Sequence, residues 1–148
     1  MPSRIPIGYI DIRVFAHATE DVDKVLSAVR NILSPELIDI VAFKKTNLTG
    51  HHGNPIVLFE TRINEESATQ AVFEKLSLGL GILDKELLAS EIDQHLDKGN
   101  LYVRLDKQSA YLNELKLCSV DPIHFRIHFK KHSQEEVVGI CRKFGLLP

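Results

Sequence analysis

The sequence predicts an α+β fold, a two-layer sandwich in which a largely antiparallel sheet carries helices on one face. Two hydrophobic periods alternate along the chain: a period of two residues, typical of strands, and a spacing of three or four, typical of helices. One connection between predicted strands, residues 48–54, is short and rich in Gly, His and Asn, which is typical of a hairpin between antiparallel strands. With no linker or repeat, residues 1–148 are expected to form a single domain.

The first half of the chain is predicted to contain a strand, a helix, two strands and a helix, at residues 9–18, 21–33, 38–47, 55–63 and 65–78. Thr19 stands where the N-cap of the first helix belongs, and Pro35 is expected to prevent that helix from continuing. Asn64 is expected to cap the second helix. Gly79 and Gly81 then mark its end, because glycine accepts the backbone conformations that terminate helices.

The second half opens with an ambiguous segment, residues 83–97, whose leucine spacing favours a helix but whose end also fits a strand. The remainder is predicted as a strand, a short helix, a strand and a final helix, at residues 101–105, 107–115, 122–131 and from 134 onward. Asp106 is expected to cap the short helix. Ser133 and Glu136 fit a capping box for the last one, which Gly145 closes.

The composition excludes some classes of protein. A net charge of −2 argues against the sequence-independent binding that is typical of strongly basic nucleic-acid-binding proteins. Residues 98–148 nevertheless carry nine basic and five acidic side chains. No apolar run approaches the roughly 20 residues that cross a bilayer, so no membrane partner is expected. The start of the chain lacks the apolar core of a signal peptide, and the two cysteines, Cys118 and Cys141, are therefore expected to be reduced thiols.

The predicted strand at 122–131 has two very different faces. Its odd positions are apolar, and its even positions carry basic or titratable side chains, namely His124, Arg126, His128 and Lys130. Lys131 and His132 extend this row past the strand end. One face can therefore join the core while the other holds cations that could bind phosphates. The alternative is an ordinary solvated outer face of a half-buried sheet.

The hairpin tip is a second candidate. Lys44 and Lys45 lead to it, the glycines around His51 and Asn54 permit close backbone approach to a ligand, and an imidazole can stack on a base. The alternative is a plain hairpin tip. The adjacent histidines also raise the question of a metal, but no His or Cys array at ligand spacing completes a set, so no metal site is predicted.

The segment 100–111 is the third candidate. Tyr102 and Arg104 share one strand face, which combines a stacking surface with a cation. Lys107 and Gln108 follow in the first turn of the short helix, where free backbone N–H groups favour an anion. The alternative is that Asp106 simply caps its helix and the segment packs.

Motifs of common enzymes are missing from the sequence: it has no P-loop, no G-x-S-x-G, no G-x-G-x-x-G and no H-E-x-x-H. We therefore predict no catalytic residues and no cofactor.

Three segments together, residues 17–21, 50–56 and 100–111, resemble an archaeal family of predicted RNA-binding proteins that is described as exosome-associated. The resemblance covers nearly the whole chain, and the run Arg-Leu-Asp-Lys-Gln at 104–108 is its most specific part. It implies a ribosomal-protein-like α+β fold, similar to that of the large-subunit protein that binds 5S ribosomal RNA. It also implies a cytoplasmic location, exosome subunits as partners and no catalysis. The family more often has an aromatic residue at the position of His52.

The sequence thus predicts a non-catalytic RNA-binding domain that binds single-stranded or structured RNA with weak sequence selectivity. The residues expected to contact RNA are Lys44, Lys45, His51, Asn54, Tyr102, Arg104, Lys107, Gln108, His124, Arg126, His128 and Lys130. The alternative is a protein-interaction or self-assembly module, a homodimer without RNA affinity, formed through an exposed sheet face or edge.

Overall fold

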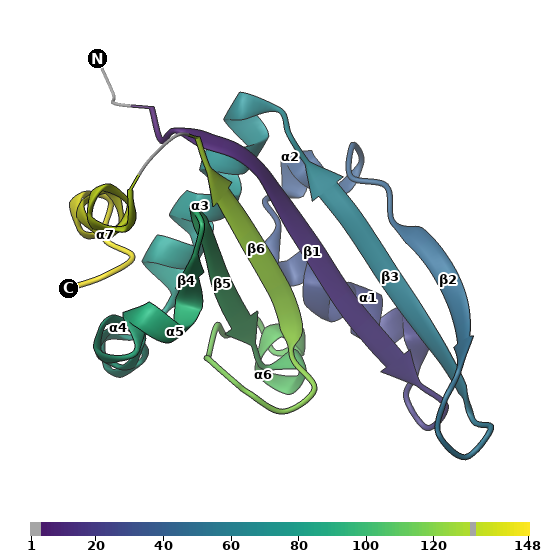
Figure 1. Ribbon diagram of the computed structural model, residues 1–148. Coiled ribbons are helices and arrows are strands. Elements are labelled where there is room, and N and C mark those ends of the chain that lie inside the picture. The colour runs from purple at the N-terminus through teal and green to yellow at the C-terminus, as the bar shows by residue number, and fades with distance from the viewer. Residues whose placement is uncertain (1–3, 131–132) are drawn as a thin grey trace.

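A computed structural model describes residues 4–130 and 133–148. Its strands form one antiparallel sheet in the order β2-β3-β1-β6-β5-β4 (Figure 1). In chain order they are β1 (Ile7–His17), β2 (Lys44–Thr49), β3 (Pro55–Ile63), β4 (Leu96–Asp97), β5 (Asn100–Leu105) and β6 (Ile123–Phe129). The long strands β1 and β6 therefore lie side by side at the centre of the sheet, although most of the chain separates them in sequence.

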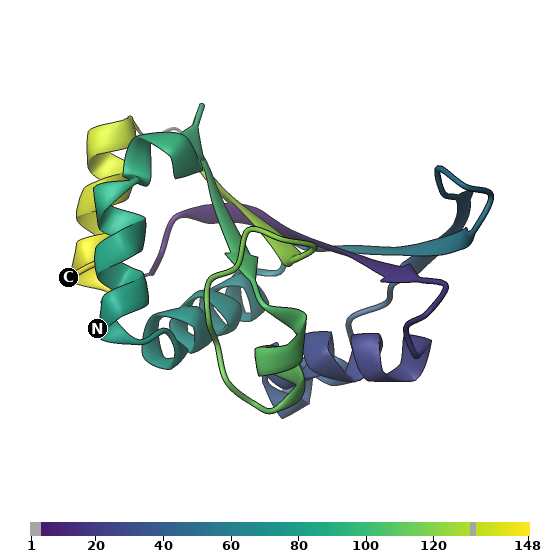
Figure 2. The ribbon, with the colours of Figure 1, turned by 90° about the horizontal axis from the view of Figure 1, so that it is seen from below.

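The helices are α1 (Val22–Ile32), α2 (Pro35–Ile38), α3 (Glu66–Gly79), α4 (Ile82–Ser90), α5 (Ile92–His95), α6 (Lys107–Tyr111) and α7 (Gln134–Lys143). Figure 2 shows α1, α3 and α6 beneath one face of the sheet, with α4 and α7 at the end near β4. The predicted α+β class and the placement of helices on one face are confirmed. No described helix is both long and apolar enough to cross a membrane.

The core lies between the sheet and this helix layer. The inward residues of β6, Ile123 through Phe129 at every second position, are fully buried, as the alternation in the sequence predicts. Phe73 of α3 packs edge-on against Phe129, with ring centroids 6.1 Å apart. Each such buried side chain stabilises the fold by about 1.5–3 kcal/mol. Cys141 also lies in this core, and burial raises the pKa of its thiol to about 12.

The structure differs from the prediction most clearly at residues 38–47, where a strand was expected to begin at residue 38. Residues 35–38 instead form the short helix α2, and β2 begins only at Lys44. Pro35 accounts for the difference, because its fixed φ and missing N–H suit the first turn of a helix as well as they oppose the interior of one.

Two predicted helix caps are also wrong. Asp21, not Thr19, caps α1 and accepts hydrogen bonds from the backbone N–H groups of Asp23 and Lys24. The residue at the cap of α3 is Glu65 rather than Asn64, and its side chain makes no capping bond. The Asp106 cap and the capping box of Ser133 and Glu136 are confirmed.

The later element boundaries shift as well. Residues 83–97 divide into α4, α5 and the two-residue strand β4, so both alternatives for that segment are partly correct. The short helix predicted to reach 115 ends at Tyr111, shortly before Asn113 takes up a positive φ of 64°. β6 ends at Phe129, and the predicted extension of its basic row through Lys131 and His132 lies outside the described residues.

Candidate nucleic-acid interface

The sheet face opposite the helices carries side chains in rows that cross the strands. Register alone creates these rows, because side chains of directly paired residues point to the same face. One row runs from β5 to β2 through Arg104, His124, Arg13, Glu60 and Lys44. The next row, two residues along each strand, contains Tyr102, Arg126, Asp11 and Arg62. Five cations and two carboxylates therefore lie on adjoining rows of one sheet face.

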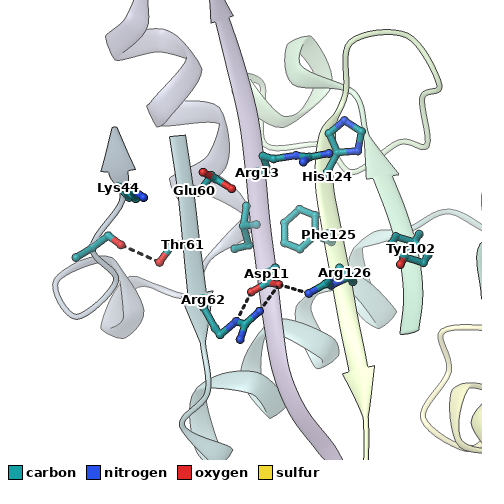
Figure 3. A pocket seen from close by; sticks show the side chains of 12 residues that line it. Asp11, Arg13, Lys44, Glu60, Thr61, Arg62, Tyr102, His124, Phe125 and Arg126 are labelled. Carbon is teal, nitrogen blue, oxygen red and sulfur yellow. Dashed lines mark hydrogen bonds and ion pairs between the residues drawn. The ribbon is translucent and has the colours of Figure 1, made fainter. Parts of the chain in front are cut away.

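Apart from Arg104, the residues of these two rows line a hollow of about 800 Å³ on the open face (Figure 3). Side chains from β1, β2, β3, β5 and β6 contribute to its lining. The β2–β3 hairpin bends away from the helix layer, as Figure 2 shows, so the open face is not flat. The lining of the hollow combines charged and aromatic side chains from five neighbouring strands.

Asp11 organises one half of the hollow. Its carboxylate accepts two hydrogen bonds from Arg62, at 2.7 and 2.9 Å, and one from Arg126 at 2.9 Å (Figure 3). Arg126 also donates to the hydroxyl of Tyr9 at 3.2 Å. We call Asp11, Arg62, Arg126 and Tyr9 the Asp11 cluster. Its geometry resembles the bidentate grip of arginine on an anion, with the anion supplied by the protein itself.

Ring stacking orders the same cluster. The guanidinium of Arg62 lies 3.9 Å from the centroid of the Tyr9 ring, and His128 stacks on Tyr9 at 4.8 Å. Nδ1 of His128 lies 2.8 Å from the side-chain oxygen of Asn100. The hydrogen bond to Asp11 raises the pKa of Arg62 above its ordinary value. Tyr9 therefore already has partners for stacking within the protein.

His124 and Arg13 line the other half of the hollow, and Arg104 lies beside His124 on β5 at its border. We call Arg104, His124 and Arg13 the arginine–histidine row. Both arginines are exposed, and neither forms an ion pair within residues 4–130 and 133–148. Burial lowers the pKa of His124, and the charges of Arg13 and Arg104 lower it further, against an opposing effect of Asp121. The row therefore presents two arginine charges around an imidazole that favours its neutral form.

The structure brings half of the sequence-predicted site residues together. Those on the open face are Lys44, Tyr102, Arg104, His124, Arg126 and His128. Lys130 follows the end of β6 and is exposed. Lys45 alternates with Lys44 and so points to the opposite face of β2. Gln108 is exposed on α6, beside α1 rather than on the open face.

Lys107 lies apart from the open face and is largely buried, with 12% of its side chain exposed. Its ammonium donates hydrogen bonds to Glu20 at 3.0 Å, to Asp121 at 2.8 Å and to the carbonyl oxygen of Phe15. These contacts join the end of β1, the start of α1 and the β5–β6 connection. An ammonium has three protons to donate, and all three have acceptors here. We therefore leave Lys107 out of the candidate interface.

The same carboxylates form a group that has the spacing of metal ligands. His17, Glu20 and Asp121 offer ligand atoms within 4.8 Å of one another. Lys107 forms ion pairs with both carboxylates, and His17 Nε2 lies 3.0 Å from Asp121. The group is thus explained by its own ion pairs.

The hairpin tip is exposed, and none of its residues lines the hollow. His51 and His52 contact each other edge to face, with ring centroids 4.8 Å apart. Gly53 has a φ of 79°, a conformation that favours glycine, and Asn54 is exposed beside it. Whether His51 and Asn54 contact RNA stays a prediction.

Sequence reasoning missed the contribution of β1 and β3 to this face. Tyr9, Asp11 and Arg13 occupy alternate positions of β1, and Arg62 lies on β3 opposite Asp11. The signal for the first three was present, because the apolar residues at 10, 12 and 14 define which positions point outward. Arg62 had no comparable signal, since its strand alternates only weakly.

The chain is similar in sequence and in structure to several known proteins. A family model described as RNA binding matches residues 9–129. The RNA-binding protein PAB1135 of Pyrococcus abyssi is 34% identical over 97% of this chain and 97% of that protein. The uncharacterized protein MJ0213 of Methanocaldococcus jannaschii is 31% identical, over 90% and 95%. The solved structure of Mth689, a DUF54 protein of Methanothermobacter thermautotrophicus, is similar with a TM-score of 0.77 and 27% identity, covering 94% of this chain and 98% of that one.

Proposed function

The chain belongs to the family described as RNA binding, and we propose that it binds RNA with the open face of its sheet and catalyses no reaction. The observation that carries the proposal is the hollow between the two rows of side chains. Its arginines and Lys44 outnumber its two carboxylates, Asp11 and Glu60, in a molecule whose total charge is −2. The protein therefore concentrates positive charge on one surface, which is what a polyanion requires.

Single-stranded RNA fits this surface better than a duplex. An open sheet face can hold unstacked bases against aromatic rings while cations bind the backbone. Tyr102 is half-exposed beside Arg126, and Phe15 is half-exposed beside Arg13 along β1. Contacts of this kind select weakly for sequence, because phosphates are identical and every base has a stacking face.

Several predictions of the family resemblance stay predictions. They concern association with exosome subunits, a cytoplasmic location and likeness to the ribosomal protein that binds 5S ribosomal RNA. The alternative of a homodimer, which rests on the exposed sheet face and edge, also stays a prediction. The relative from Pyrococcus abyssi is named an RNA-binding protein, which supports RNA rather than self-assembly as the main activity.

The test is a titration of the protein with a fluorescent single-stranded RNA and with an RNA duplex, each at low and at high salt. We expect tighter binding to the single strand than to the duplex. Salt should weaken this binding, because the protein displaces cations bound to the RNA and their release is less favourable at high salt. If neither RNA binds at low salt, the proposal is overturned.

A charge-reversal pair locates the surface. Lys44→Glu/Arg104→Glu changes two exposed cations at opposite ends of one row, neither of which has an ion pair in the described part of the chain. The matched control, Lys24→Glu/Lys75→Glu, makes the same charge change on the exposed surfaces of α1 and α3. We expect the first variant to lose most of its RNA affinity and the control to lose little. Equal losses would show that net charge, not this face, controls binding.

A further inference from the structure

We propose that Arg13, His124 and Arg104 bind one phosphate group of the RNA together, and that His124 takes up a proton as this phosphate binds. The inference rests on the proposed function and adds the ligand group and its dependence on pH. It concerns one row of the open face, not the whole surface.

The first support is geometric. His124 pairs with Arg13 on one side and with Arg104 on the other, so the three side chains emerge from neighbouring strands at the same level. Strands are about 4.8 Å apart, which places the two arginine backbones about 10 Å apart across β6. Side chains as long as arginine can meet over the imidazole from that separation. Figure 3 shows Arg13 extending along the sheet toward His124.

The second support is the difference in charge compensation between the two rows. In the Asp11 cluster, one carboxylate of the protein occupies the position between Arg62 and Arg126. The corresponding position between Arg13 and Arg104 holds His124, which supplies no negative charge. Glu60 lies opposite Arg13 on β3, but within residues 4–130 and 133–148 it forms no ion pair with it. An anion from outside would complete the second row as Asp11 completes the first. Phosphate suits this position, since it accepts several hydrogen bonds and arginine binds it in bidentate fashion.

The third support is the neighbouring apolar surface. Tyr102 lies two residues from Arg104 on β5, and Phe15 lies two residues from Arg13 on β1, on the same face. Positions of this kind are about 7 Å apart along a strand. A nucleotide whose phosphate lies on the arginine–histidine row therefore has an aromatic ring within reach on either side for its base.

Proton uptake follows from the groups that face His124. Arg13 on β1 and Arg104 on β5 disfavour its protonation, as burial does, while Asp121 of the β5–β6 connection favours it. Asp121 is itself paired with Lys107 and His17, and Arg126, two residues along β6, is paired with Asp11. A bound phosphate would neutralise the field of the two arginines and accept a hydrogen bond from the imidazolium. The proton comes from solvent and forms an N–H bond on the imidazole, and no bond between heavy atoms forms or breaks.

The experiment measures the affinity for a labelled oligouridylate of about 10 nucleotides, between about pH 5 and pH 8, where histidine changes charge. We expect the wild-type affinity to rise as the pH falls, by at most about tenfold per pH unit for one proton. His124→Gln should flatten this rise. His52→Gln, which changes an exposed histidine of the hairpin tip that does not belong to the arginine–histidine row, is the control and should keep it.

The arginines are tested by Arg13→Ala/Arg104→Ala, with Arg30→Ala/Arg142→Ala as a control that removes two exposed arginines from α1 and α7. The first variant should lose about tenfold or more in affinity and also lose the pH dependence. Nuclear magnetic resonance of the His124 ring gives a direct readout: RNA should raise its pKa in the wild type but not in the arginine variant.

The outcomes separate the two proposals. Salt-sensitive RNA binding with an unchanged pH profile in His124→Gln would overturn the phosphate site and leave RNA binding by the open face intact. A protein that binds no RNA at low salt would overturn the proposed function. Inorganic phosphate serves as a second probe. If the protein binds no RNA but phosphate raises the pKa of His124, the anion site alone is supported.

Discussion

The Asp11 cluster and the arginine–histidine row lie on the same sheet face, one row apart, and each contains two arginines. In the cluster, a single carboxylate accepts hydrogen bonds from both guanidiniums. In the row, a half-buried histidine stands between them and its protonation is disfavoured. The comparison teaches that the number of cations on a surface does not measure its capacity for anions. What matters is whether the protein has already supplied the counter-charge.

Lys107 is the extreme case of a cation with internal partners, and it gives the largest expected effect. Lys107→Ala leaves Glu20 and Asp121, which are partly exposed to solvent, without their ammonium. We expect a loss of about 2 kcal/mol in the free energy of unfolding, measured by urea denaturation. RNA affinity under folding conditions should stay unchanged. A variant that is fully stable but defective in RNA binding would return Lys107 to the interface.

Removing the charge of Asp11 should leave the two arginines of the Asp11 cluster without a counter-charge from the protein, as in the arginine–histidine row. Asp11→Asn keeps the shape of the side chain but removes the charge that holds Arg62 and Arg126. We expect a lower unfolding midpoint, because two cations then repel each other, together with tighter RNA binding, because both become available to phosphates. Calorimetry and the RNA titration measure the two effects. Weaker RNA binding in this variant would mean that the cluster acts as a preformed unit.

The smallest expected effect concerns stability in the absence of RNA. Because the pKa of His124 is lower in the folded protein than in the unfolded chain, the unfolded chain binds the proton more readily. The wild type should therefore lose some stability as the pH falls through about 6.5, the ordinary value for histidine. His124→Gln should lose less over the same range, as followed by thermal unfolding. Identical pH dependence in both proteins would show that folding does not lower the pKa of His124.

Helices and strands were predictable where a single local pattern governs them. The alternation around His124 and Arg126 correctly separated the core face of β6 from its open face, because side-chain direction in a strand is fixed by position alone. The Ser133 capping box was predictable for a similar reason, since its two hydrogen bonds join residues three apart. Pro35 was harder, because one residue type fits both the start of a helix and its interruption.

By itself, the sequence determined which residues point away from the core, and hence that β6 has a basic face. Only the tertiary structure decided which cations share that face and which are neutralised. Pairing between strands far apart in the chain placed Arg13 and Arg104 on either side of His124 and put Asp11 between Arg62 and Arg126. The same long-range packing enclosed Lys107 with Glu20 and Asp121. The physical reason is that side-chain alternation is a local property of one strand, whereas register and ion pairing depend on which strands meet.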